Sequence, residues 1–175
     1  MKKLILILFF ISSLFGQDDL LEAARAGTLS QSQINELISK CNSGDGASCR
    51  SIAAFYYNKN KDLRENDAKL QALSIEYYTK GCNLKYGAAC SSLGSIYKRG
   101  EGVAQDITKS LEYYTKGCDY NGVLGCYWAG RHYEKESKTK SGAEKIAAEL
   151  KAKQYYKKGC DLGYKLCCSD LKDLQ

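Results

Sequence analysis

The sequence predicts an all-α protein, a solenoid of about four helix–turn–helix repeats, and three observations predict it. Eight of the nine cysteines form four pairs with seven residues between partners, and the first members of successive pairs lie 41, 36 and 42 residues apart. A repeat period of this size is typical of helical solenoids. The chain has no proline and is 44% hydrophobic, which favours long uninterrupted helices. The pairs are Cys41/Cys49, Cys82/Cys90, Cys118/Cys126 and Cys160/Cys168.

The first 16 residues have the pattern of a secretory signal peptide. Two lysines precede an apolar run from Leu4 to Ile11, and small residues lead to Gly16, after which we expect cleavage. Residues 17–175 are then expected to form a single secreted or periplasmic solenoid domain. No later apolar stretch approaches the roughly 20 residues of a membrane helix, so no membrane span is expected. In an oxidising compartment, regularly spaced cysteines indicate disulfides and not zinc ligands, so no metal or cofactor is expected.

The charge pattern argues against nucleic acid as a partner. The formal net charge is +6, but the 26 basic residues are interspersed with 20 acidic ones. A nucleic-acid-binding surface requires a stronger and more concentrated positive charge.

The repeats are predicted at about residues 28–60, 65–101, 103–138 and 142–175, each as two antiparallel helices. In the third repeat, Ile107, Leu111 and Tyr114 form one apolar stripe on a first helix that we expect Gly117 to end. A second helix is expected from about Val123 to Glu134. The phrase Tyr-Tyr-Thr-Lys-Gly-Cys before Cys82 returns before Cys118 and, almost unchanged, before Cys160. One tyrosine of each such pair is expected to face the core and the other to be more exposed.

Each cysteine pair spans a predicted turn, so a disulfide would join the end of one helix to the start of the next. Closing so small a loop stabilises the fold by about 2 to 3 kcal/mol per bridge. The ninth cysteine, Cys167, aligns with Ser48, Ala89 and Gly125 of the other repeats, which predicts a small core residue with a free thiol. The alternatives are an exposed thiol that links to a partner and a register exchange with Cys168.

Small and aromatic residues recur after each second cysteine. Four positions on stand Ala53, Gly94 and Gly130, which are expected to let neighbouring helices approach closely. Seven positions on stand Tyr56, Tyr97 and Tyr133, which are expected to fill the space between helix pairs. Two enlarged loops carry basic residues that indicate either a solvated face or a docking surface for an anionic partner. These residues are Lys59, Lys61, Arg64, Lys135, Lys138, Lys140 and Lys145.

One stretch of the chain resembles a known repeat family. It reads Leu93-Gly94-x-x-Tyr97-x-x-Gly100-x-Gly102-Val103-x-x-Asp106-x-x-Lys109-Ser110-x-x-Tyr113-Tyr114. This pattern is similar to the Sel1-like (Sel-one-like) repeat, a relative of the tetratricopeptide repeat, and the cysteine spacing resembles the Helicobacter cysteine-rich proteins. The resemblance implies a right-handed superhelix of disulfide-linked helix pairs with a concave binding face. It also implies penicillin binding or weak β-lactamase activity, without a catalytic motif that could be carried over by position.

Few residues offer catalytic chemistry. Serine β-lactamases use Ser-x-x-Lys, and Ser95 with Lys98 is the first candidate for acylation with lysine assistance. Ser137 with Lys140 and Ser169 with Lys172 also match, but 16 serines among 21 lysines should give about two matches by chance. His132 is the only histidine, which excludes a zinc site of several imidazoles. A partly buried, hydrogen-bonded histidine is favoured over a catalytic base.

The sequence therefore favours a scaffold that binds a peptide, a protein or a peptidoglycan-derived ligand on its inner face. Repeat arrays form extended binding surfaces, and no catalytic constellation is visible. The alternative is a penicillin-binding protein with weak β-lactamase activity, with a β-lactam as its ligand.

Overall fold

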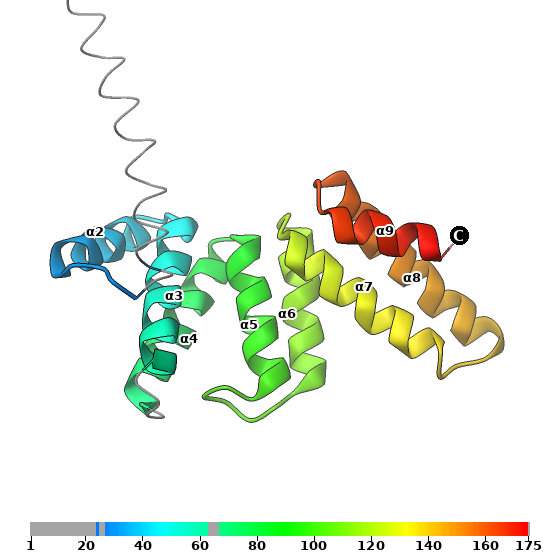
Figure 1. The fold of residues 1–175 in the computed structure, drawn as a ribbon, viewed down its shortest axis with the longest axis horizontal. Coiled ribbons are helices and arrows are strands. Elements are labelled where there is room, and N and C mark those ends of the chain that lie inside the picture. The colour runs from blue at the N-terminus through cyan, green and yellow to red at the C-terminus, as the bar shows by residue number, and fades with distance from the viewer. Residues whose placement is uncertain (1–23, 25–26, 63–66, 175) are drawn as a thin grey trace, which may run out of the picture. The chain divides into compact units, whose positions relative to one another are not determined.

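The computed structural model describes residue 24 and residues 27–62 and 67–174, and all regular secondary structure in this part is α-helical (Figure 1). The expected signal peptide, residues 1–16, lies outside the described residues. No described helix is both long and apolar enough to cross a membrane. The described helices are α2 (Gln31–Asn42), α3 (Gly46–Asp62), α4 (Ala68–Asn83), α5 (Gly87–Arg99), α6 (Ile107–Asp119), α7 (Val123–Ser137), α8 (Gly142–Asp161) and α9 (Lys165–Asp173).

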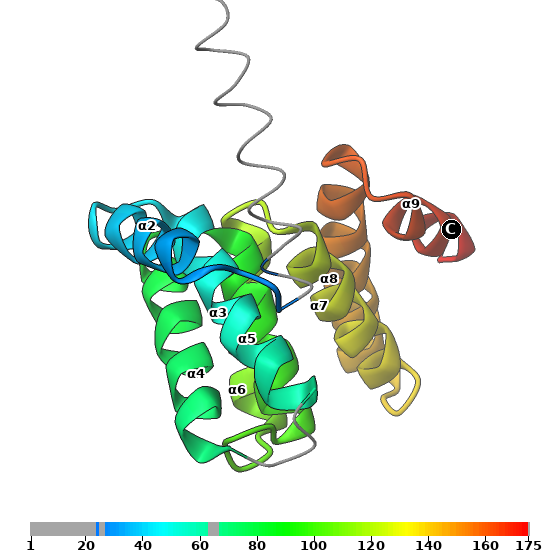
Figure 2. The ribbon, with the colours of Figure 1, turned by 60° about the vertical axis from the view of Figure 1, so that its left-hand side comes forward.

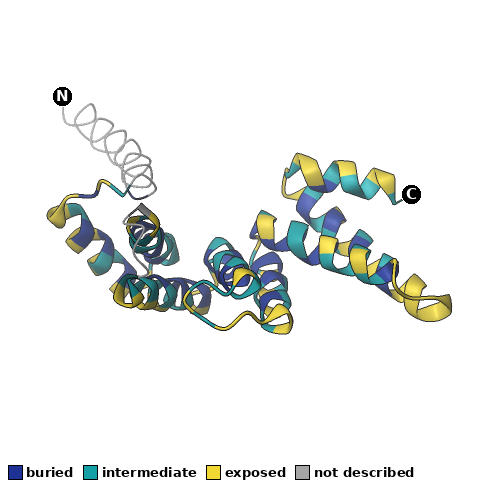
Figure 3. Ribbon diagram, turned by 60° about the horizontal axis from the view of Figure 1, so that its bottom comes forward, coloured by how far each residue is buried: buried dark blue, intermediate teal, exposed yellow. Residues whose placement is uncertain are grey.

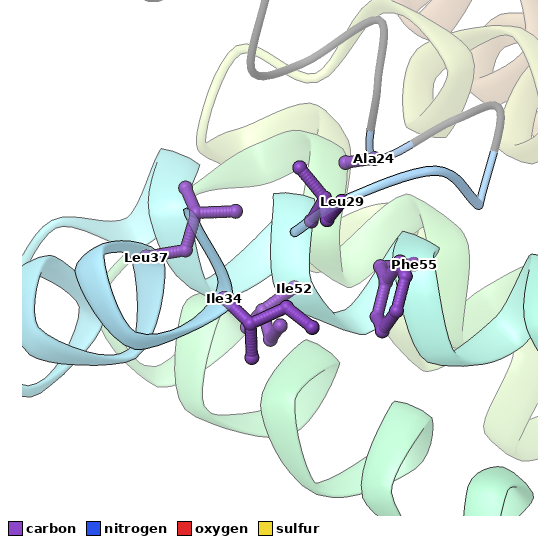
Figure 4. Close-up of a cluster of buried hydrophobic side chains, with 6 residues drawn as sticks. All are labelled: Ala24, Leu29, Ile34, Leu37, Ile52 and Phe55. Carbon is purple, nitrogen blue, oxygen red and sulfur yellow. The ribbon is translucent and has the colours of Figure 1, made fainter. Parts of the chain in front are cut away.

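The helices fall into two compact units, one ending at Tyr77 and the other beginning at Tyr78. In the first unit, Ser30 caps α2 by accepting a hydrogen bond from the backbone N–H of Gln33, whose side chain accepts one from Ser30 N–H. This capping box satisfies two N–H groups that the first turn of a helix leaves unpaired. The core of this unit lies between α2 and α3 (Figure 4) and is formed by buried apolar residues. They are Ala24, Leu29, Ile34, Leu37, Ile52 and Phe55.

In the second unit, helices that are consecutive in the sequence pack against each other. Contacts join α5 to α6, α6 to α7, α7 to α8, and α8 to α9, and this order can be followed in Figures 1 and 2. Buried residues line the faces between these helices, whereas the turn between α7 and α8 is exposed (Figure 3). The prediction of an all-α fold of disulfide-linked helix pairs is confirmed.

The four turns inside the helix pairs share one backbone conformation. The third residue after each first cysteine has a left-handed φ: 99° at Gly44, 60° at Lys85, 61° at Asn121 and 88° at Gly163. The next residue donates its N–H to a carbonyl five positions back, as Gly122 does to Gly117 at 2.7 Å. Such a hydrogen bond is the signature of a Schellman turn and satisfies a carbonyl that the helix end leaves free.

The expectation that Gly117 ends the first helix of its repeat is wrong. Helix α6 continues to Asp119, and the left-handed residue that stops it is Asn121. Gly117 is needed for packing instead, because a Cβ there would lie 2.5 Å from the Oγ of Ser91 on α5. The glycine thus allows α5 and α6 to approach each other closely.

Each turn is closed by a disulfide between cysteines eight positions apart. The bonded pairs are Cys41–Cys49, Cys82–Cys90, Cys118–Cys126 and Cys160–Cys168. The first cysteine of each pair lies in the last turn of one helix, and the second lies in the first turn or turns of the following helix. Every hairpin in the described chain is therefore closed covalently at its turn.

Successive hairpins are joined by a buried tyrosine that lies against a glycine. A Cβ at Gly94 would lie 2.6 Å from the ring of Tyr114, and a Cβ at Gly130 would lie 2.6 Å from the ring of Tyr156. Both rings are buried, and Tyr156 is fully inaccessible to solvent. The small residue therefore makes room for the first helix of the following repeat, at a cost in helix propensity.

The other tyrosine of each pair is half-buried and stacks on a tyrosine of the preceding helix. Tyr97 stacks on Tyr113 with ring centroids 5.4 Å apart, and Tyr133 stacks on Tyr155 at 5.6 Å. Lys109 lies over the Tyr97 ring at 4.4 Å. The expected division of each tyrosine pair into a buried and a more exposed member is confirmed, and both members hold adjacent hairpins together.

The extra residues of the fourth repeat lengthen helices and do not form an enlarged loop. Helix α7 continues to Ser137 and α8 contains 20 residues, so only residues 138–141 connect them. On the first unit, α3 likewise continues to Asp62. Of the basic residues expected in loops, Lys59, Lys61, Lys135 and Lys145 are therefore helical, and Lys138 and Lys140 lie in the connection. Arg64 lies outside the described residues.

Cys167 is buried and free of disulfide bonding. Its Sγ would lie 2.4 Å from a Cβ at Gly159, so the thiol occupies space that this glycine leaves open. Burial raises the pKa of the thiol to about 11, with a further contribution from Asp170. At neutral pH the thiol is protonated, which disfavours exchange with the neighbouring disulfide.

Removing one disulfide should destabilise the second unit. For the paired variant Cys118→Ser, Cys126→Ser we expect a loss of about 2 to 3 kcal/mol in the free energy of unfolding, because the unfolded chain regains loop entropy. Urea unfolding followed by far-ultraviolet circular dichroism measures this loss. A variant as stable as the parent protein would show that the bridge does not constrain the fold.

The tyrosine–glycine contact can be tested because the effect of alanine at Gly130 on stability should change sign when the Tyr156 ring is removed. Alanine at an exposed helical position stabilises by about 1 kcal/mol relative to glycine, whereas overpacking in a core costs about 1 to 3 kcal/mol. Because the Tyr156 ring cannot move into solvent, Gly130→Ala should destabilise the protein. In a Tyr156→Leu background the same change should be neutral or stabilising. Equal effects of alanine in both backgrounds, measured by urea unfolding, would contradict this contact.

Candidate functional site

A pocket of about 390 Å³ opens on the second unit, between the end of α5, the start of α6 and the middle of α7. Its volume lies within the range of small-ligand sites. The residues that line it come from both hairpins that meet at the Gly94–Tyr114 contact. They are Lys98, Ile107, Ser110, Leu111, Tyr114, Trp128, Arg131, His132, Glu134, Lys135 and Lys138.

Part of the pocket lining is apolar and aromatic. Tyr114 is buried, and the Trp128 ring stacks on it with centroids 6.1 Å apart. Ile107, in the first turn of α6, is 48% exposed. The first turn of α6 is fixed by Asp106, whose carboxylate accepts the N–H of Lys109 at 2.8 Å. A ligand with an apolar group can therefore bury surface here without displacing protein side chains.

Other lining residues are cationic. Four basic side chains and one carboxylate line the pocket. The carboxylate, Glu134, is already engaged: it bonds Lys138 at 2.7 Å and accepts the hydroxyl of Tyr156 at 2.7 Å. Despite its partial burial, these two hydrogen bonds and the nearby Arg131 hold the pKa of Glu134 below its usual value.

Among the described ion pairs, none involves Lys98 or Lys135. Arg131 has only a distant partner, since its guanidinium lies 3.9 Å from a carboxylate oxygen of Asp170. The pocket thus holds more positive charge than the surrounding protein neutralises.

Lys98 is the most constrained of these cations. Its Nζ lies 3.7 Å from the centroid of the Trp128 ring, which is a short cation–π contact. Burial lowers the pKa of Lys98, and the positive charges of Arg99, Arg131 and Lys135 lower it further. A bound anion would relieve this repulsion, so the site favours negative charge.

His132 lies at the edge of the pocket. Its ring contacts the Tyr133 ring edge-on at 5.5 Å. Burial lowers the pKa of the imidazole below 6.5, and Glu136 opposes this effect. Burial thus favours the neutral form of the imidazole. The histidine is half-buried, as expected, although the contact described for it is aromatic.

The two side chains of the candidate Ser-x-x-Lys pair make different described contacts. The Ser95 hydroxyl shares a hydrogen bond with the Tyr114 hydroxyl at 3.0 Å, while the Lys98 amine lies over Trp128. Lys98 lines the pocket, whereas Ser95 is not among the lining residues.

The two other Ser-x-x-Lys matches are placed differently. The Ser137 hydroxyl donates to the backbone carbonyl of Glu134 at the end of α7, and Ser169 with Lys172 lies exposed on the short helix α9. Within the described ranges, no group of three or more His, Cys, Asp or Glu side chains is placed to hold a metal ion.

Trp128 and Arg131 are pocket residues that were not predicted from the sequence. A signal was present, because both depart from the repeat pattern. Two positions after the second cysteine, Trp128 stands where other repeats have Ser51, Ser92 and Asp170. Five positions after the second cysteine, Arg131 stands where other repeats have Ala54 and Ser95.

Comparison with known proteins identifies the repeats. The family model described as the Sel1 repeat matches residues 87–119 and 124–164, and these two ranges contain every residue that lines the pocket. The chain is 50% identical over 36 residues to the protein named "Putative beta-lactamase HcpD" of Helicobacter pylori. This match covers 21% of the chain and 12% of that protein, so the chain matches only a small part of this relative.

Two solved structures share the fold. A Sel1 repeat protein from Oxalobacter formigenes is 25% identical, with a TM-score of 0.60, covering 79% of this chain and 96% of that one. Cysteine-rich protein B of Helicobacter pylori is 26% identical, with a TM-score of 0.57, covering 89% of this chain and 96% of that one. The four disulfides are typical of proteins outside the reducing cytosol.

Proposed function

We propose that this chain, in which two segments match the Sel1 repeat, acts as a disulfide-linked scaffold that binds a peptide, a protein or a cell-wall fragment without transforming it. The observation that supports this most directly is the pocket between α5, α6 and α7. It combines apolar lining residues with three cations, Lys98, Arg131 and Lys135, that have no close carboxylate partner, which is the arrangement of a binding site for an amphipathic anion.

The scaffold prepares this pocket for binding. The lining residues lie on two hairpins that are each closed by a disulfide, Cys82–Cys90 and Cys118–Cys126. The hairpins are joined through Tyr114, whose ring lies against Gly94. A pocket that is rigid before binding loses less conformational entropy when it takes up a ligand.

We further propose that the protein is exported, to the periplasm or the medium. The signal-peptide pattern of residues 1–16 supports export, and four disulfides are stable in such a compartment.

Photo-crosslinking in the native compartment tests the scaffold function. A photoreactive amino acid in place of Lys135, on the pocket rim, should give a discrete crosslinked product because a bound partner contacts this position. The matched control is the same substitution at Lys157, which is exposed on α8 and does not line the pocket. Identical products from both positions, or none from Lys135, would contradict binding at the pocket.

A second candidate function is slow β-lactam hydrolysis, which the name of the related HcpD and the Ser95–Lys98 spacing suggest. Since the Ser95 hydroxyl is bonded to Tyr114 and Lys98 lies over Trp128, we expect no nitrocefin turnover by the oxidised protein and no acyl adduct in its mass spectrum. Turnover that disappears in Ser95→Ala would establish the enzyme and overturn the non-enzymatic scaffold.

A further inference from the structure

The charge balance of the pocket specifies its ligand more closely than the proposed function does. Lys98, Arg131, Lys135 and Lys138 contribute four positive charges and Glu134 one negative charge. Glu134 forms an ion pair with Lys138, and the Arg131 guanidinium lies 3.9 Å from a carboxylate oxygen of Asp170. Lys98 and Lys135 are left without a described carboxylate partner. One carboxylate from a ligand would leave part of this excess uncompensated.

The apolar side of the pocket sets a second requirement. Ile107 and Leu111, in the first turns of α6, and Trp128, on α7, line the pocket together. Ile107 is about half exposed, although it belongs to the apolar stripe of its helix. A ligand that covers these side chains gains from burial of apolar surface, which an inorganic anion or a hydrophilic acid cannot provide.

The position of Lys98 connects the two requirements. Its ammonium lies over the Trp128 ring, so the cation and the largest aromatic surface of the pocket are in direct contact. A ligand group that reaches Lys98 therefore also meets the aromatic side. The acid and the apolar group of the ligand must be close neighbours, as they are on adjacent residues of a peptide.

We propose that the pocket recognises an acidic peptide segment in which at least two carboxylates flank a large apolar side chain. This inference rests on the proposed function and names the chemistry of its partner. The pocket volume of about 390 Å³ fits one large side chain and its neighbours, and not a folded surface. The remainder of the partner lies outside the pocket.

Capped tripeptides give a direct test. Acetyl-Glu-Phe-Glu-amide is compared with the Gln-Phe-Glu, Gln-Phe-Gln and Glu-Ala-Glu analogues, and with Lys-Phe-Lys. Trp128 is the only tryptophan of the chain, so its emission reports on the pocket itself, and calorimetry gives an independent affinity. Each carboxylate should tighten binding by about two- to fivefold, as exposed ion pairs do. Alanine in place of phenylalanine should weaken binding by about tenfold or more, from the lost apolar contact.

Variants locate the interaction. Lys98→Met keeps the apolar stem of the side chain and removes its charge. The ratio of affinities for Glu-Phe-Glu and Gln-Phe-Gln should therefore fall by the part that Lys98 contributes. Lys157→Met removes an exposed lysine outside the pocket and should bind as the parent protein does. Circular dichroism and urea unfolding confirm that both variants are folded. Binding of Glu-Phe-Glu should also weaken as salt is raised from about 50 to about 500 mM.

Four outcomes would overturn the inference. They are equal affinity for the acidic and the glutamine peptides, unchanged binding by Lys98→Met, tighter binding of the lysine peptide, and absence of binding by any peptide at about 10 mM, where even weak ligands bind. A peptide that binds only through a free C-terminal carboxylate, tested with acetyl-Gln-Phe-OH, would likewise contradict an internal acidic segment. A specific crosslink from Lys135 together with any of these results would keep the scaffold function and reject this ligand chemistry.

Discussion

The closure of each hairpin by a disulfide next to a left-handed turn residue is the constraint on which the rest of the structure depends. The bridge links cysteines eight positions apart, and the turn residue between them reverses the chain. Once two helices are held antiparallel in this way, their apolar stripes face a common core. A repeat of about 36 residues could not bury enough surface by itself, so the covalent bond supplies stability that packing alone would not. The tyrosine rings against Gly94 and Gly130 then fix how consecutive hairpins of the second unit pack.

The helix positions that do not maintain the hairpins are free to vary, and residues at such positions form the candidate site. The cysteines, the small residue and the tyrosines recur in the repeats because they maintain the hairpins and their contacts. Trp128, Arg131 and Lys98 occupy positions that differ from one repeat to the next. All three line the pocket together with Tyr114, on whose ring Trp128 stacks, so the tyrosine that connects two hairpins also contributes to the pocket. The proposed function therefore depends on residues that differ between repeats of the same backbone arrangement, and not on a separate domain.

Much of the fold could be predicted from the sequence because the decisive features are local. The distance between Cys118 and Cys126 is set by one turn, and the buried role of Tyr114 follows from its helical offset to Ile107 and Leu111. The end of α6 could not be predicted from Gly117, since a glycine serves equally to stop a helix or to admit a neighbouring helix, and the Ser91 contact decides between them. The pocket was harder still to predict from the sequence, because Lys98 and Trp128 contact each other from different hairpins. The exceptional residues at repeat positions were visible in the sequence, but their proximity was not.

The covalent closure of the hairpins is tested most directly by peptide mapping of the natively oxidised protein under non-reducing conditions, with free thiols alkylated before and after unfolding. We expect four linked peptides, each joining cysteines eight positions apart, and alkylation of Cys167 only after unfolding. A bridge between different repeats, a disulfide that includes Cys167, or free thiols at the eight paired positions would contradict it.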